Sequence, residues 1–148
     1  MERRSSNLFE GLKSVGHVTG PLPFVVRHGR SPNDTRILTI VKRHFLSFTI
    51  NLTLTEVSIP HEHDIYVLTA DERYIYSTSG RSILQWGRGG KHLIQRLDNG
   101  HQADVKFIVK LGSDELVSVD GDNVLFNWGL ADKTILNIIH FDEGSFKI

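Results

Sequence analysis

Apolar and polar residues alternate along most of the chain, in short runs separated by turn residues such as Ser31-Pro32-Asn33-Asp34. A period of two is typical of β-strands with one buried face, whereas a helix repeats its apolar positions every three to four residues. The pattern predicts strands in twelve runs: 24–28, 36–41, 45–50 and 54–59; 64–70, 74–79, 82–87 and 92–97; and 104–111, 115–120, 123–128 and 134–141. We therefore expect an all-β protein with three groups of four strands.

The three groups form an internal repeat. His61 and His101 lie 40 residues apart, Trp86 and Trp128 lie 42 apart, and Phe48 stands 38 residues before Trp86. A period of about 40 to 45 residues with four strands per unit is typical of a WD-repeat β-propeller blade. The fold expected from the repeat is therefore an all-β WD-repeat β-propeller.

The repeat divides the chain into blade-like units. Residues 1–22 form an N-terminal lead-in segment, residues 23–59, 60–99 and 100–141 form three blade-like units, and residues 142–148 begin a truncated next blade. Propellers usually have four to eight blades, so three blades make an incomplete propeller. The chain is a piece of a longer propeller, closes by oligomerising, or is not a propeller. We favour a piece, and its uncovered blade face predicts association or poor solubility.

A His before the first strand of a blade and a Trp on its third strand come close when the four-stranded sheet folds. Buried imidazole and indole rings need hydrogen-bond partners, which a Ser or Thr on the second strand and an Asp in the next turn commonly supply in WD repeats. Asp120 stands in the Ser/Thr place of the third unit, and Gly80 stands in the Asp place of the second. The candidate members of this structural tetrad are His61, Thr78 and Trp86, and His101, Asp122 and Trp128.

Composition restricts the class of protein. The 148 residues suit one domain, and there is no run of about 18 apolar residues that could span a membrane. The N-terminus MERRSSNLFE lacks the apolar centre of a secretory signal, so we expect a cytosolic or nuclear protein without a membrane partner. The absence of cysteine excludes disulfides, Cys-ligated metal sites and thiol redox chemistry.

The net charge is zero but unevenly distributed. Residues 1–50 carry 8 Lys/Arg and 3 Asp/Glu, a net of +5, whereas residues 101–148 carry 4 and 8, a net of −4. Basic residues of the first unit could line one rim of that blade and contact RNA phosphates or a partner. The alternative is that they are solvated strand ends. The residues concerned are Arg27, Arg30, Arg36, Lys42 and Arg43.

Two other patterns suggest chemistry but are explained by the repeat or by a turn. His61-Glu62-His63-Asp64 could bind zinc, but adjacent residues of an extended segment alternate sides and a third ligand is not identified. The stretch 87–91, GRGGK, resembles a phosphate-binding loop, yet a strand rather than a helix is expected after it, so we expect a hairpin turn. No Gly-x-Ser-x-Gly elbow occurs. We predict no catalytic residue, metal, cofactor or small-molecule substrate.

Four segments carry a resemblance to a known family: LFEGLKSVG (8–16), PFVVR (23–27), VSVDGD (117–122) and FDEGSFKI (141–148). The chain resembles the N-terminal part of the tandem-propeller WD-repeat subunits of the small-subunit processome, in the UTP-B subcomplex, also called the T-cell activation WD-repeat protein family. The resemblance implies a non-catalytic scaffold in the nucleolus, inside the nucleus, that acts in pre-rRNA processing beside other WD-repeat subunits and pre-ribosomal RNA. The alternative is a generic WD-repeat adaptor, because fold alone does not fix function.

Overall fold

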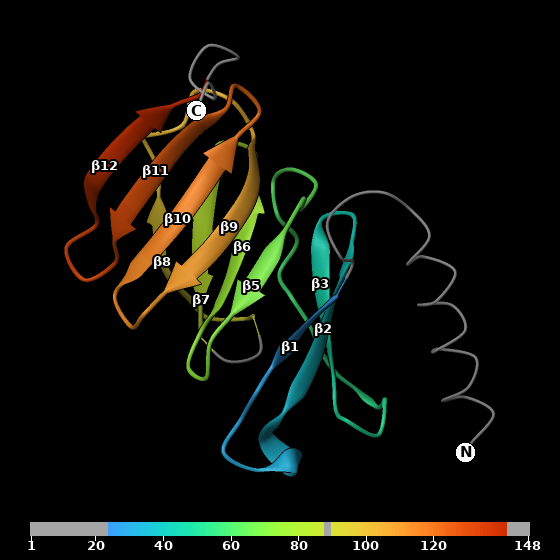
Figure 1. Cartoon of the computed structure of the whole chain (residues 1–148). Helices are drawn as coiled ribbons and strands as arrows, with labels where there is room; N and C mark the ends of the chain where they lie inside the picture. Colours follow the sequence, from blue (N-terminus) through green and yellow to red (C-terminus); the bar gives the residue numbers. More distant parts are fainter. Residues whose placement is uncertain (1–23, 88–89, 142–148) are drawn as a thin grey trace.

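The structure is a computed structural model that describes residues 24–87 and 90–141. This part of the chain contains twelve strands and one short 3-10 helix, η1 (Pro32–Asp34) (Figure 1). The first blade comprises β1 (Phe24–Arg27), β2 (Arg36–Val41), β3 (His44–Phe48) and β4 (Leu54–Val57). The second comprises β5 (Leu68–Ala70), β6 (Ile75–Ser79), β7 (Ser82–Trp86) and β8 (Leu93–Leu97). The third comprises β9 (Val105–Leu111), β10 (Glu115–Asp120), β11 (Val124–Gly129) and β12 (Thr134–His140). The predicted all-β class and its three groups of four strands are confirmed.

Each blade is a four-stranded antiparallel meander in which consecutive strands are neighbours. The second and third strands are joined by tight turns, and Gly80 in the turn between β6 and β7 has a φ of +59°. Such left-handed conformations match the twist of paired strands and favour Gly at this position. These turns therefore fix the register of the second and third strands of a blade.

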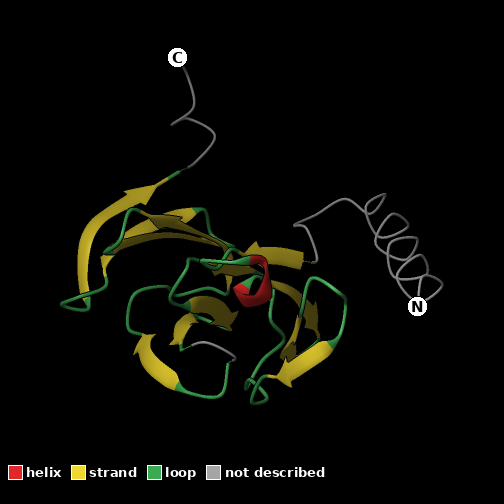
Figure 2. Cartoon of the chain, turned by 90° about the horizontal axis from the view of Figure 1, so that it is seen from below, coloured by secondary structure: helices red, strands yellow, loops and turns green. Residues whose placement is uncertain are grey.

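The three blades stand side by side as part of a ring. Their first strands are in contact, β1 with β5 and β5 with β9 (Figure 1). Seen from below, the blades form an open arc around a shared centre (Figure 2). The predicted lead-in segment 1–22 and the predicted start of a next blade at 142–148 lie outside the described residues.

Two apolar layers hold the blades together. The middle blade contributes one face to each layer: Ile75 packs toward the first blade, and its neighbour Tyr76 packs toward the third. Successive residues of a strand point to opposite faces, so every residue of β6 is buried. The layer between the first and second blades contains Leu38, Phe45, Ile65, Leu68, Ile75, Leu84 and Trp86. The layer between the second and third contains Tyr76, Ile83, Leu97, Val105, Ile108, Leu116, Phe126, Trp128 and Leu130.

The same irregularity recurs in all three blades. The register between the third and fourth strands shifts at Ser47/Phe48, at Gln85/Trp86 and at Asn127/Trp128. In each case the shift falls immediately before the aromatic residue that marks the repeat. Phe48, Trp86 and Trp128 are therefore structurally equivalent, as the sequence spacing predicts.

Candidate functional site

The third blade contains a buried hydrogen-bonded cluster, which we call the third-blade clasp: His101, Ser118, Asp120 and Trp128. His101 precedes β9, and its Nδ1 lies 2.7 Å from Asp120 Oδ2 while its Nε2 lies 2.5 Å from Ser118 Oγ. Trp128 Nε1 donates to the same Ser118 Oγ at 2.8 Å. With Nδ1 donating to the carboxylate, Nε2 is the acceptor for the serine hydroxyl. The clasp joins the loop before the first strand to the second and third strands.

The second blade contains an equivalent cluster, the second-blade clasp: His61, Ser77, Trp86 and the main chain of Ile59. His61 Nε2 lies 2.7 Å from Ser77 Oγ, which also accepts from Trp86 Nε1 at 2.8 Å. The Nδ1 atom of His61 lies 3.1 Å from the carbonyl oxygen of Ile59 instead of a carboxylate. Burial lowers the pKa of His61 more than its backbone hydrogen bonds raise it. His61 is therefore held in its neutral form.

The third-blade clasp has the polar order of a Ser-His-Asp catalytic triad. Ser118 is wholly buried at 0% exposure, however, and His101 and Asp120 are 5% and 3% exposed. A nucleophile must reach a substrate, whereas the Ser118 hydroxyl is enclosed and already accepts the indole N–H of Trp128. The arrangement can therefore hold strands together but offers no access for a substrate.

Two of the predicted clasp residues are corrected by the structure. The bridging hydroxyl of the second blade belongs to Ser77, because Thr78 points to the other face of β6 and its Oγ1 accepts from the Tyr66 N–H. In the third blade the carboxylate is Asp120, whereas Asp122 is exposed in the turn and donates its N–H to Asp120. The turn after β10 is longer than the turn after β6, so the serine stands 10 residues before Trp128 but 9 before Trp86. The same distance before both tryptophans, eight residues, was expected for the Ser/Thr place, and it falls on Thr78 and Asp120 instead of the two serines.

The first blade places Thr39 and Phe48 where the other blades have the serine and the Trp. Sequence reasoning missed one signal for this blade. A Gly-His pair like Gly100-His101, Gly16-His17, stands 44 residues before His61. That pair lies outside the described residues, so its contacts are not described.

A polar contact links the middle blade to the third blade. It lies on the face of the middle blade opposite to the one that carries Trp86. Gln95 Nε2 donates to Gln85 Oε1 at 2.6 Å and to the carbonyl oxygen of Leu130 at 3.0 Å. Gln85 is buried, and Leu130 belongs to the turn after β11. This amide pair therefore fixes the third-blade turn against the second blade.

Further polar contacts on this face of the middle blade reach the first strand of the third blade. Tyr76 Oη donates to Asp71 Oδ2 at 3.3 Å, and Lys110 Nζ on β9 lies 3.5 Å from the same carboxylate oxygen. Burial raises the pKa of the Tyr76 hydroxyl, and the Asp71 charge raises it further. The Tyr76 hydroxyl therefore remains protonated and acts as a donor. The polar side chains of the middle blade thus contact the third blade at two places, the Leu130 carbonyl and the Lys110 ammonium.

Arg27, one of the candidates for contact with RNA or a partner, has a structural role. Its side chain is buried, Nη2 donates to the Asp34 carbonyl at 3.0 Å, and Nη1 donates to the Glu72 carbonyl at 3.4 Å. Asp34 is in the first blade and Glu72 in the second, so the guanidinium bridges two blades. Neither open alternative, RNA contact or a solvated strand end, describes Arg27, because it is buried and its guanidinium donates to main-chain carbonyls.

The other four basic candidates do not lie on one rim. Arg30 is exposed in the β1–β2 turn, and Arg36 at the start of β2 donates to the Asn33 carbonyl at 2.7 Å. Lys42 and Arg43 are exposed in the β2–β3 turn at the other end of β2. A strand of six residues is roughly 20 Å long. The predicted single basic rim is therefore wrong, because β2 separates the two pairs.

The two ligand-like motifs also have structural positions. Both ring nitrogens of His61 are engaged in the second-blade clasp, while His63 is exposed. No group of three or more His, Cys, Asp or Glu side chains within 24–87 and 90–141 is placed to hold a metal ion. Strand β8 rather than a helix follows the 87–91 motif and pairs with β7, which precedes it; residues 88–89 of the motif lie outside the described residues.

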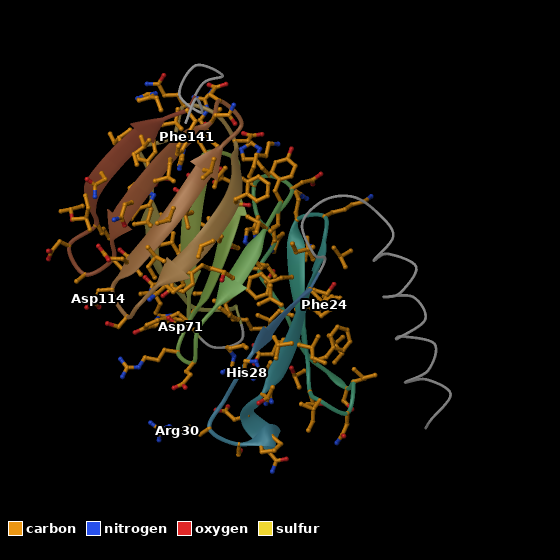
Figure 3. The ribbon with its side chains drawn as sticks, in the orientation of Figure 1. Phe24, His28, Arg30, Asp71, Asp114 and Phe141 are labelled. Carbon is orange, nitrogen blue, oxygen red and sulfur yellow. The ribbon has the colours of Figure 1, made fainter. Side chains whose placement is uncertain are left out.

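The turns at one end of the blades form a hollowed rim, which we call the first-turn rim: the β1–β2, β5–β6 and β9–β10 turns. Arg30, Asp71 and Asp114 mark these three turns in Figure 3. A cleft of about 650 Å³ lies between the second and third blades on this rim, and Tyr74, Asp71 and Asp114 are among its lining residues. A second hollow of about 600 Å³ lies between the first and second blades, with Arg30 and Tyr74 in its wall. Concave rims with aromatic and charged side chains are suited to binding macromolecular partners.

Comparison with solved structures identifies the architecture. The chain superimposes on the WD40 β-propeller domain of Doa1 with a TM-score of 0.65 at 11% sequence identity, over 73% of this chain and 37% of that chain. This part of the chain has the WD40 β-propeller fold. The propeller is not closed, since the described residues form three blades of a fold that usually has four to eight.

Sequence comparison gives a WD-repeat relative. The chain is 29% identical to human WD repeat-containing protein 36 over 147 residues, which is 99% of this chain and 16% of that protein. The chain therefore spans about one sixth of the length of the relative it matches. No protein-family model matches the chain. In the part that the structure describes, no helix is long and apolar enough to cross a membrane.

Proposed function

We propose that this chain belongs to a non-catalytic scaffold subunit of the nucleolar small-subunit processome, which acts in pre-rRNA processing and small ribosomal subunit biogenesis. The observation that carries the proposal is the similarity to a WD-repeat protein along 99% of the chain. The segments 8–16, 23–27, 117–122 and 141–148, which resemble the processome subunits, support the finer assignment.

The geometry is consistent with binding rather than chemistry. The Ser-His-Asp arrangement is buried and used for packing, whereas the exposed hollows lie on the first-turn rim. WD40 propellers generally act as interaction scaffolds. The partners of the proposed scaffold are other WD-repeat processome subunits and pre-ribosomal RNA, and its proposed location is the nucleolus of the nucleus.

The proposal is tested in cells of the source organism with the polypeptide that contains these residues tagged at its own locus. Nuclear extract is separated on a gradient, and the fractions are probed for the tag and for pre-ribosomal RNA. Co-migration with large pre-ribosomal particles, with failure of small-subunit RNA processing on depletion, is the expected result. Migration as a small complex without that RNA would contradict the proposal and favour a WD-repeat adaptor such as a substrate receptor or trafficking platform.

A further inference from the structure

A further hollow, smaller than the two on the first-turn rim, lies at the opposite end of the third blade. We call it the outer-strand groove, and its volume is about 490 Å³. One wall is the loop before β9, with Gly100 and Gln102, and the other is the face that β11 and β12 turn toward the second blade. His140 also lines the groove, and the next residue, Phe141, marks this end of the blade in Figure 3, away from Asp114. The groove lies where the third blade meets the second, so both of its walls are described residues.

The floor of the outer-strand groove is apolar. The register places Phe126 opposite Ile138 and Trp128 opposite Ile135, so these four side chains share one face of the blade. Phe126 and Trp128 are buried, whereas Ile138 is 51% exposed and Ile135 is 39% exposed. The loop wall lies directly on the Phe126 ring, since a Cβ at Gly100 would come within 2.8 Å of it. Two exposed isoleucines in a groove over buried aromatic rings are typical of a surface that binds a partner.

The second blade fills the equivalent place with a side chain of its own. Arg96 has the position of Ile138, because each pairs with the residue two positions before the tryptophan of its blade. The Arg96 guanidinium lies 3.9 Å from the Glu62 carboxylate and 3.3 Å from the Asp98 carboxylate. Glu62 belongs to the loop before β5, so the arginine spans from the outer strand to that loop. Long cationic side chains cover apolar surface with their alkyl stems while the charged head stays in water.

The third blade has an unpaired carboxylate but no such arginine. Asp122 is exposed at the end of the groove, and its carboxylate has no ion pair or hydrogen bond with a described residue. Asp120 beside it is buried in the third-blade clasp. Lys106 lies near Gly121 in the same turn, but its ammonium is held 3.6 Å from the centre of the Tyr66 ring. The groove therefore combines an apolar floor with a negative end and is lined by no Lys or Arg among the described residues.

We propose that the outer-strand groove binds a segment of a partner protein that presents a Lys or Arg next to an aliphatic or aromatic residue. The apolar residue packs on Ile135 and Ile138, and the cation lies beside the Asp122 carboxylate. The partner thus supplies what Arg96 supplies within the second blade. The negative charge of Asp122 disfavours RNA phosphates, so this surface contacts protein. The inference does not depend on the processome assignment, because a scaffold and an adaptor both bind proteins.

The test compares three peptides, each with an uncharged fluorescent label, by fluorescence anisotropy with the purified polypeptide that contains these residues. The peptides are Gly-Leu-Arg-Leu-Gly, Gly-Leu-Glu-Leu-Gly and Gly-Ser-Arg-Ser-Gly. The first is expected to bind at least several-fold more tightly than the other two, because it alone combines apolar residues with a cation. Equal binding of the three peptides, or no binding of the first, would overturn the proposal.

Ile138→Arg gives the third blade the arrangement of the second, since the chain's own guanidinium then reaches the groove. This variant is expected to weaken binding of the Leu-Arg-Leu peptide at least about tenfold, because it fills the groove and repels the cation. Leu93→Arg is the matched control: it adds the same charge at a residue of β8 that is 39% exposed and does not line the groove. Equal losses in the two variants would place the binding elsewhere and contradict the proposal.

Reversing the charge at the end of the groove tests the cation site by a gain of binding. Asp122→Lys is expected to reverse the preference, so that the Leu-Glu-Leu peptide binds more tightly than the Leu-Arg-Leu peptide. Asp132→Lys, exposed in the β11–β12 turn at the other end of β11, is the control and is expected to keep the original preference. Circular dichroism verifies that each variant remains folded. An unchanged preference in the Asp122 variant would overturn the proposal.

Discussion

Trp128 Nε1 donates a hydrogen bond to Ser118 Oγ at 2.8 Å, and Trp86 Nε1 donates to Ser77 Oγ at the same distance one blade earlier. In both blades a buried histidine lies on the other side of the serine, within 2.5 Å or 2.7 Å. One hydroxyl therefore serves two rings from different parts of the blade. This relationship explains why a His before the first strand and a Trp on the third recur together in the repeat.

Removing the Ser118 hydroxyl tests the energetic importance of the third-blade clasp. Ser118→Ala leaves His101 Nε2 and Trp128 Nε1 buried without their partner and is expected to lower the free energy of unfolding by about 3 kcal/mol. Ser113→Ala, in the exposed β9–β10 turn, is the control and is expected to change it by less than about 0.5 kcal/mol. Urea unfolding followed by tryptophan fluorescence measures both. Equal effects of the two substitutions would count against a stabilising clasp.

Two neighbouring carboxylates of the third blade are expected to behave differently. Asp120→Asn removes the charged partner of His101 and is expected to cost about 2 kcal/mol, because the pair is buried and hydrogen-bonded at 2.7 Å. Asp122→Asn changes an exposed side chain and is expected to leave stability within about 0.5 kcal/mol. Thermal and urea unfolding of both variants measure the difference. A larger loss for the Asp122 variant would return the tetrad role to that residue.

His61 is expected to make stability depend on pH below its ordinary pKa. Burial lowers the pKa of His61 in the folded state below 6.5, so the unfolded chain binds a proton more readily at mildly acidic pH. The contribution of neutral His61 is fully present above pH 6.5 and is lost as pH falls toward the folded pKa, with a slope of at most about 1.4 kcal/mol per pH unit. His61→Gln should reduce this slope, whereas His63→Gln, at an exposed position, should not. Urea unfolding at several pH values would contradict the account if the two variants had equal slopes.

Substitution of two arginines near the end of β1 is expected to affect stability differently, because Arg27 is buried and Arg30 is exposed. Arg27→Ala removes a buried guanidinium together with its hydrogen bonds to the Asp34 and Glu72 carbonyls, and it is expected to cost about 2 to 3 kcal/mol. Arg30→Ala affects an exposed side chain and is expected to change stability by less than about 0.5 kcal/mol. Urea unfolding measures both variants. If Arg27→Ala retained full stability, the guanidinium would not be a bridge between blades.

Exposed basic residues lie at both ends of the first blade, so substitutions at each end can show which end contacts RNA. If the first-turn rim contacts pre-ribosomal RNA, Arg30→Glu should weaken crosslinking several-fold, while Lys42→Glu with Arg43→Glu should have little effect. The opposite result would place the RNA at the β2–β3 end. Unchanged crosslinking in both variants would show that these residues are solvated strand ends.

The sequence predicted the strands well because each blade repeats the same alternation of apolar residues. Residues 36–41 and 115–120 were predicted with the observed bounds of β2 and β10. The predicted strand 64–70 is shorter in the structure, where β5 begins at Leu68. The preceding residues instead join the previous blade, since the Ile65 N–H donates to the Lys42 carbonyl.

The clasp was predicted less accurately, for a physical reason. The His and Trp positions were found from the period, but the serines depend on the length of one turn, which differs between the second and third blades. The burial of Arg27 was also not predictable, because its partners are the main-chain carbonyls of Asp34 and Glu72. Every residue has a main-chain carbonyl, so the sequence does not show which carbonyls accept hydrogen bonds from Arg27.

Hydrogen exchange of the tryptophan indoles tests the central structural claim most directly. The chain has two tryptophans, so a ¹H–¹⁵N spectrum contains two indole signals, from Trp86 and Trp128. Both indoles are buried and donate to a buried serine, so both signals are expected to exchange about 10³-fold or more slowly than a free indole. Exchange of both at the free-indole rate would contradict the clasps and the blade packing that depends on them.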